Sequence, residues 1–494
     1  MPDLSFSALN VTSILPMAIN VIGGIIILII DLFLKKPNKA LYIILSSIFI
    51  LLSLLSLLYM NSTAIGFFDL VIVDGLAVLS QIIILVASLL FIFFLISKDR
   101  FPEFECGEFY ILFLFMIAGY QFMVSSDNLI LIFLGLESSS LALYALVALS
   151  KKQKALEAGI KYFTLGALGS GFFAFGLMFI YASSGSVDIF DLSTPISGLL
   201  VLDSSGNEYF LSLGFIFLLG AIGFKLSFFP FHTWVPDVYE GSTPPLAFYM
   251  SIATKIAGFV VAIRLFNVFL NTDIPFISVA LFVIVILSMT IPNIIALLQT
   301  DVQRMLAYSS ISQAGFGLAC IYINTEQSMV ALFLYWILFL FTNLGAFGLL
   351  WLTHNKNKTW DSRFTSPYTK FSGLVKLSPI IAVSFGIFML SLGGIPPFGL
   401  FWGKLYLISS SVNAGHNILA LILLLNSAIA IYYYIKLIVF MFLKEPITKD
   451  SGIYHQNASY PMIGIIAIAL IVSIFAIFFI EGFLGIITNY LFNF

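Results

Sequence analysis

Six of the 22 Lys and Arg residues of the chain lie inside its long apolar segments, where they could hold or transfer protons. They are Lys161, Lys225, Lys255, Arg264, Lys404 and Lys436. One carboxylate, Glu137 in LIFLGLESSSLALY, has a similar setting. A charged side chain deep in a bilayer costs about 3 kcal/mol on insertion scales, so it is rarely retained without a role. This set of residues is typical of a proton or ion conductor.

Four of these residues form the predicted proton-transfer site: Glu137, Lys225, Lys255 and Lys404. Burial favours the neutral form of a lysine, whereas a nearby carboxylate favours its charged form. Glu137 could therefore switch Lys225 between holding and releasing a proton. Lys255 could accept that proton, and Lys404 could pass it outward. The alternatives are a structural ion pair and lysines that extend to the membrane interface.

The remaining ionisable residues of these segments have weaker signals. Lys161 is either a proton-uptake group or an interfacial lysine. His232 titrates in the range that suits proton uptake, but a structural histidine fits equally well. We expect Arg264 and Lys436, each near a segment end, to be interfacial anchors.

Polar residues also gather at the start of one later segment, and they could line a file of water molecules. Close packing of small side chains is the alternative. The residues are Tyr308, Ser309, Ser310, Ser312 and Gln313.

The composition excludes a soluble protein. Of the 494 residues 61% are hydrophobic and 9% are charged, with a mean hydropathy of +1.09, whereas soluble domains are about 25% charged. The net charge of −2 forms no basic patch for nucleic acid. Cys106 and Cys320 alone cannot build a metal or iron–sulfur site, so we expect no metal and no bound cofactor. The glycines of GALGSG lie in an apolar span without a preceding strand, which favours helix packing over nucleotide binding.

The apolar segments predict an all-α polytopic membrane protein that forms a single transmembrane domain over 1–494. About 20 apolar residues are needed for each crossing. Fourteen segments meet this need, near 13–34, 40–60, 75–97, 108–124, 128–148, 158–182, 211–231, 244–270, 276–298, 304–323, 328–352, 379–408, 415–443 and 461–490.

The loop charges support this count, because the other 16 Lys and Arg residues all fall in alternate connections or at their edges. We call the side that carries them the basic side; the connections of the other side contain no Lys or Arg. The positive-inside rule makes the basic side cytoplasmic and leaves both termini outside. The first apolar stretch ends in lysines instead of a cleavage site, so we expect a retained helix and no signal peptide. The 16 residues are Lys35, Lys36, Lys39, Lys98, Arg100, Lys151, Lys152, Lys154, Arg304, Lys356, Lys358, Arg363, Lys370, Lys376, Lys444 and Lys449.

Two segments combine a lysine with helix breakers, which predicts discontinuous helices 7 and 12. Lys225 precedes Pro230 and Pro236, and Lys404 follows Pro396 and Pro397. Proline removes a backbone donor and clashes with the preceding turn. Matching breaks five helices apart, in opposite directions, indicate two inverted five-helix repeats around an ion path. The predicted parts are 1–107 with three helices, repeats at 108–270 and 276–443, and a last helix at 461–490.

Several motifs that contain these residues resemble the antiporter-like membrane subunits of proton-pumping NADH:quinone oxidoreductase, respiratory complex I. The resemblance covers roughly residues 105–440 and is closest to subunit N, called subunit 2 in mitochondria. The motifs are GLESSSLALYALVAL, LEAGIKYFTLGALGSG, GFKLSFFPFHTWVPDVYEGSTPP, QTDVQRMLAYSSISQAGF and SLGGIPPFGLFWGKLYL.

The resemblance implies a role for each matched residue. Glu137 and Lys225 match the family's interacting glutamate–lysine pair of helices 5 and 7. Lys255 matches its central helix 8 lysine, and Lys161 a helix 6 lysine. Lys404 matches the terminal group of helix 12, which is a lysine in subunits N and L but a glutamate in subunit M.

The resemblance also implies the reaction and the partners. Partner subunits would carry FMN and iron–sulfur clusters and pass electrons from NADH to quinone, while this chain would bind no cofactor and translocate protons. Its partners would be other antiporter-like and small hydrophobic membrane subunits, most simply in a bacterial inner membrane, with an organellar inner membrane as the alternative. A subunit of a multi-subunit cation/proton antiporter, a subunit of a membrane-bound hydrogenase and a membrane scaffold remain open as other functions.

Overall fold

The computed structural model describes residues 9–60, 62–97, 101–192, 205–272, 274–353, 366–447 and 457–494. Parts of the predicted loops 183–210 and 353–378 lie outside these residues, as do Lys98, Arg100, Lys356, Lys358, Arg363 and Lys449.

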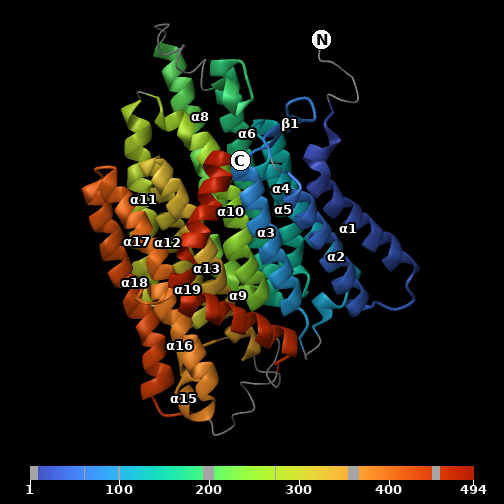
Figure 1. Cartoon of the computed structure of the whole chain (residues 1–494), viewed down its shortest axis with the longest axis vertical. Helices are drawn as coiled ribbons and strands as arrows, with labels where there is room; N and C mark the ends of the chain where they lie inside the picture. The colour runs from blue at the N-terminus through green and yellow to red at the C-terminus, as the bar shows by residue number, and fades with distance from the viewer. Residues whose placement is uncertain are drawn as a thin grey trace.

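Nearly all of the described chain is helical, and the predicted fold class is confirmed. Thirteen described helices are long and apolar enough to cross a membrane. The remaining predicted segment, 379–408, consists of two helices of 15 residues on either side of a break. Figure 1 shows the long helices running side by side.

Three long helices come first, with a small hairpin that the sequence did not predict. The antiparallel hairpin pairs Ala64 with Val73. The elements are η1 (Val11–Ile14), α1 (Leu15–Phe33), α2 (Lys39–Leu58), β1 (Ala64–Gly66), β2 (Val71–Val73) and α3 (Gly75–Phe94).

The next two groups of elements fall within the residue ranges of the two predicted repeats. The first contains η2 (Pro102–Phe104), α4 (Gly107–Val124), α5 (Leu129–Ala148), α6 (Gln153–Ser184), α8 (Ser205–Leu226), α9 (Trp234–Gly241) and α10 (Pro244–Leu270). The second contains α11 (Pro275–Leu297), α12 (Val302–Ile323), α13 (Glu326–Leu352), η3 (Tyr368–Phe371), α15 (Leu374–Leu377), α16 (Pro379–Gly393), α17 (Gly399–Asn413) and α18 (Asn417–Leu443). The last helix, α19 (Tyr460–Asn493), packs on α13 and α3.

The order of neighbours is the same in both groups. Helix α4 packs on α5 as α11 packs on α12, and α6 packs on α8 as α13 packs on α16 and α17. In Figure 1 the chain runs downward through α8 to α9 but upward through α16 to α17. The two broken helices therefore run in opposite directions, as inverted repeats require.

Both predicted breaks are present. Helix α8 ends at Leu226, and Ser227 then adopts the left-handed region with φ of 60°. Helix α16 ends at Gly393, and Gly394 follows with φ of 77°. A Cβ atom on Gly394 would lie 2.9 Å from Cδ of Lys404. Glycine therefore provides both the backbone conformation and the space that Lys404 needs.

The connections predicted on the basic side are tied to one another, which supports the predicted alternation. Arg304, at the start of α12, forms an ion pair with Asp237 of α9. Asp301 pairs with Pro367 in an isolated β-bridge. In Figure 1 both α9 and α15 lie in the lower half of the bundle.

Candidate functional site

Lys225 lies in the last turn of α8, at the first break. Its side chain is buried, and Nζ donates a hydrogen bond to Ser140 Oγ of α5 at 2.8 Å. The same Nζ lies 5.6 Å from the centre of the Tyr120 ring of α4. A cation is stabilised over an aromatic face, and more strongly where water is excluded. Side chains of two neighbouring helices, α4 and α5, therefore hold the Lys225 side chain in place.

Glu137 lies on α5 three residues before Ser140, and its carboxylate is only partly buried. It accepts a hydrogen bond from Ser170 of α6. Glu137 is also close enough to Lys225 to act on it electrostatically. The sequence predicted an interacting pair, and the structure refines that prediction. The two charges are neighbours, but each is bound by its own serine.

Lys255 is placed near the middle of α10, the most completely buried of the candidate spans. Only 2% of Lys255 is exposed. Its Nζ donates to the Oγ of Ser310 at 2.7 Å and also to the Ser310 carbonyl oxygen. Both acceptors belong to α12, so Lys255 links the first predicted repeat to the second.

Lys404 lies on α17 beyond the second break and is 4% exposed. Its Nζ is 3.3 Å from the carbonyl oxygen of Leu392 and 3.5 Å from that of Gly393. These carbonyls end α16, and the C-terminal end of a helix attracts a positive charge. Nζ also lies 5.1 Å from the centre of the Phe316 ring of α12.

Helix α12 carries further polar side chains near Ser310, which binds Lys255, and near Phe316, beside which Lys404 lies. Ser309 shares a hydrogen bond with the Tyr434 hydroxyl of α18. Gln313 accepts one from the Tyr335 hydroxyl of α13, and its Nε2 lies 3.5 Å from the Tyr434 hydroxyl. The sequence pointed to Ser309, Ser310 and Gln313 but missed both tyrosines, because these lie on other helices with no polar pattern of their own.

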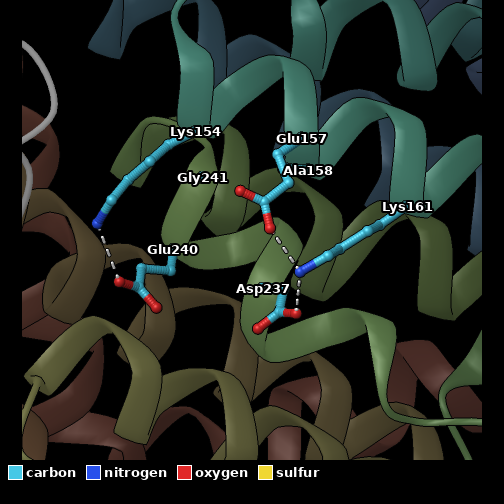
Figure 2. Close-up of a pocket in the computed structure, with 7 residues that line it drawn as sticks. All are labelled: Lys154, Glu157, Ala158, Lys161, Asp237, Glu240 and Gly241. Atoms are coloured by element: carbon cyan, nitrogen blue, oxygen red, sulfur yellow. Dashed lines mark hydrogen bonds and ion pairs between the residues drawn. The ribbon is translucent and has the colours of Figure 1, made fainter.

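A charged cluster lies on the basic side, where α6, α9 and α12 meet. Lys161 contacts Glu157 and Asp237, each at 2.8 Å. Figure 2 shows these side chains with Lys154 and Glu240, around a surface cavity of about 140 Å³. Carboxylates thus hold Lys161 at an exposed surface, whereas Lys225, Lys255 and Lys404 are buried. The sequence could not distinguish these two settings.

Asp237 is the centre of this cluster. Burial raises the pKa of Asp237, but hydrogen bonds from Lys161 and Arg304 outweigh this and hold the pKa below its usual range. Arg304 also contacts Glu240 at 2.7 Å. The carboxylate of Asp237 therefore stays charged at neutral pH and fixes α9 between α6 and α12.

His232 lies in the turn between α8 and α9 and is buried. Burial lowers the pKa of its imidazole, with partial compensation from a backbone hydrogen bond at Pro230. Its Nδ1 has no hydrogen-bond partner among the described residues. A neutral ring beside Phe229 fits a structural role at least as well as a relay role.

Comparison with known proteins decides the family. A family model described as "NADH:quinone oxidoreductase/Mrp antiporter, TM" matches residues 126–430. The NADH-quinone oxidoreductase subunit N of Sulfurimonas denitrificans is 50% identical, with 99% of this chain and 98% of that protein aligned. The chain belongs to the subunit N family of NADH-quinone oxidoreductases. The subunit N of Helicobacter acinonychis is 47% identical, with 97% of this chain and 98% of that protein aligned.

Chains of two solved complexes have the same fold as this chain. A chain of respiratory complex I from Thermus thermophilus has a TM-score of 0.78 at 27% identity, with 95% of this chain and 98% of that chain covered. A chain of the Mrp complex from Dietzia has a TM-score of 0.79 at 17% identity, covering 98% of both chains. The second likeness concerns the fold alone.

The structure corrects the predicted role of Arg264 in this member of the subunit N family. It is not an interfacial anchor, because only 9% of its side chain is exposed and it binds two carboxylates. Nη2 contacts both oxygens of Asp74 at 2.9 Å, and Nη1 contacts Asp127 at 2.9 Å. No sequence pattern indicated Asp74 and Asp127 as its partners, because each lies in a separate connection.

Lys436 of α18 is partly buried near the basic-side end of α11. Its Nζ donates to the carbonyl oxygens of Leu297 and Gln299 at 3.3 and 3.0 Å. It also lies 4.7 Å from the centre of the Tyr368 ring. Lys436 thus satisfies carbonyls at the end of a helix, which is compatible with its predicted place as an anchor.

Proposed function

We propose that this chain is the proton-translocating membrane subunit of an NADH:quinone oxidoreductase. The observation that carries the proposal is the burial of three lysines, Lys225, Lys255 and Lys404, within the helical bundle, with polar groups of α12 beside Lys255. Such charges are costly in a membrane and mark ion pathways. Relatives named subunit N support the reaction class, a proton-translocating oxidoreductase or translocase.

The proton path follows the order of the side chains. Lys225 receives a proton when the charge of Glu137 favours its ammonium form, and releases it when that influence weakens. The neutral amine of Lys255 accepts the proton and becomes an ammonium held by Ser310. Release toward Lys404 runs along Ser309, Gln313 and the tyrosine hydroxyls, and Lys404 then passes the proton outward.

Electron transfer takes place in other subunits in this proposal. FMN, iron–sulfur clusters and quinone belong to those partners, and this chain binds no redox centre. Coupling therefore reaches the lysines as a change in charge or conformation at a subunit boundary. The half-buried Glu137, between the exposed Leu134 and Leu141 on α5, supports a neighbouring membrane subunit at this face.

The same proposal implies which membrane holds the chain and which side of the chain faces the cytoplasm. The bacterial sources of the relatives support an inner membrane. The positive-inside rule then makes the basic side cytoplasmic, with both termini on the opposite side.

Purification from native membranes tests the proposal first. A tagged chain isolated in mild detergent should bring flavin- and iron–sulfur-bearing subunits with it. Small antiporter subunits without a redox partner would instead assign the chain to cation/proton exchange. Proton pumping by Glu137→Gln and Lys225→Ala variants of the isolated complex then tests the path itself.

A further inference from the structure

A second, smaller cavity lies behind the charged cluster on the basic side. Its volume is about 20 Å³, and η2, the end of α5 and the start of α10 enclose it. Gly241 lines both this cavity and the open one of Figure 2. One buried water needs roughly 10–15 Å³. The small cavity therefore has room for one water, next to a surface that solvent reaches.

Glu103, Ser150 and Thr243 give the cavity a polar lining. Glu103 of η2 lines it and is 5% exposed, and Thr243 lines it and is 7% exposed. The hydroxyl oxygens of Thr243 and Ser150 are buried there and have no hydrogen-bond partner among the described residues. Buried hydroxyl groups are nearly always hydrogen-bonded to protein or to an ordered water. Two such groups beside a buried carboxylate make a site that a water molecule fits.

A polar line leads inward from this cavity along α12. The carbonyl of Ser242, which also lines the cavity, accepts a hydrogen bond from Gln303 Nε2 at 3.2 Å. The same Nε2 donates to the Tyr239 carbonyl at 2.6 Å. Gln303 is buried, and its Oε1 has no partner among the described residues, which provides a place for a second water.

The line ends at Lys255. Seven residues separate Gln303 from Ser310, so both lie on one face of α12 about 10.5 Å apart. Burial raises the pKa of Tyr239, and a hydrogen bond between its side chain and Ser310 lowers it in part. Ser310 in turn binds Lys255.

We propose that the small cavity is a proton-uptake site, in which Glu103 exchanges protons between the basic-side solution and one ordered water on the way to Lys255. A proton from the solution neutralises the Glu103 carboxylate. Glu103 then returns to its charged form as the water passes a proton inward, and the amine of Lys255 becomes an ammonium. The inference rests on the proposed function and adds a second supply of protons to Lys255, whose release toward Lys404 still requires the change of charge at Lys225.

Variants of Glu103 in the intact complex test the role of its carboxylate. Glu103→Gln should lower the initial rate of proton pumping about a hundredfold, at the lower end of the contribution of a positioned acid or base. Glu103→Asp should restore a large part of the rate. Glu108→Gln removes an exposed carboxylate five residues away and should pump normally. Assembly is checked on native gels, so a loss of complex is separated from a loss of pumping.

Thr243→Val, which keeps the side-chain volume, tests the water. High-resolution cryo-electron microscopy of the intact complex should find a water between Glu103, Ser150 and Thr243, and should find it missing in this variant. A dry cavity, or normal pumping by Glu103→Gln, overturns the uptake site. If Lys225→Ala and Lys255→Ala also pump normally, the proposed function itself fails, whereas their loss alongside a normal Glu103→Gln rejects only the uptake site.

Discussion

Lys225 and Ser140 form a hydrogen bond of 2.8 Å between α8 and α5, and this serine lies three residues beyond Glu137. The charge of Glu137 therefore acts on a lysine that the same helix also binds through a hydroxyl group. A small shift of α5 moves Glu137 and Ser140 together relative to Lys225, so it changes both the separation of the two charges and the hydrogen bond that holds Nζ. This arrangement suits a group whose affinity for a proton must change during a cycle.

Replacing Lys225 with Ala should reduce proton pumping to background while the complex still assembles. The alanine removes the buried amine that carries the proton at the first break in the proposed path. Pumping is measured from the quenching of a pH-sensitive dye in vesicles.

Lys436→Ala is the matched control for the loss of a lysine. It removes hydrogen bonds to two carbonyls and should cost about 1–3 kcal/mol of stability at most, with pumping retained. Equal loss of pumping in both variants would indicate a general effect of removing membrane lysines, against the proposed path.

Ser310→Ala should lower pumping several-fold without loss of the fold. It removes the hydroxyl contact of Lys255 but leaves the Ser310 carbonyl as an acceptor. Pumping is compared with that of Ser411→Ala, another buried serine, whose Oγ bonds only a backbone carbonyl near the end of α17. A Ser310→Ala variant that pumps as fast as this control would contradict the connection through α12.

Gly394→Ala should both destabilise the protein and impair pumping. The left-handed conformation costs an alanine about 1–2 kcal/mol, and the new Cβ atom meets the side chain of Lys404. The thermal unfolding midpoint and the pumping rate are measured together. Gly415→Ala also has positive φ but meets no atom within 4 Å, so it should lose stability alone.

The ion pairs of Asp237 predict how its contribution to the free energy of unfolding depends on pH. Its folded pKa lies below the ordinary value of 3.8, so its contribution is present above that pH and is lost as the pH falls through the lower, folded value. Across the neutral range the contribution should be constant. Unfolding midpoints of the parent chain and of Asp237→Asn should therefore differ by a constant amount from pH 5 to pH 8. A difference that disappears within this range would contradict the assigned ion pairs.

Arg264→Met should destabilise the chain by about 1–3 kcal/mol, because it leaves two partly buried carboxylates without their cation. The measurement is thermal unfolding in detergent. Adding Asp74→Asn and Asp127→Asn to the same chain should recover part of the loss. A single variant as stable as the parent would mean that the ion pairs make no net contribution.

Much of the fold could be predicted from this sequence because lipid imposes simple rules. Runs of about 20 apolar residues predicted the membrane crossings. The lysines and arginines of the loops predicted the side of the membrane on which each loop lies. The breaks were predictable since proline and glycine act locally, at Pro230 and at Gly394. The grouping into 1–107, 108–270, 276–443 and 461–490 remains a prediction.

The partners of the charged residues could not be predicted in the same way. Lys225 and Ser140 are 85 residues apart, and Lys255 and Ser310 are 55 apart. Helix packing brings them together, and no periodicity in a single sequence reports it. Arg264 was misassigned for this reason, because its position near a helix end is compatible with both an anchor and a buried ion pair.

The Arg264 contacts also constrain how the chain is made. Asp74 is synthesised 190 residues before its arginine, and Asp127 is synthesised 137 residues before it. During translation both carboxylates are therefore without their arginine while α5, α6 and α8 are inserted. The ion pairs of Arg264 therefore form only after α10 has been made, so this part of the bundle closes late in synthesis.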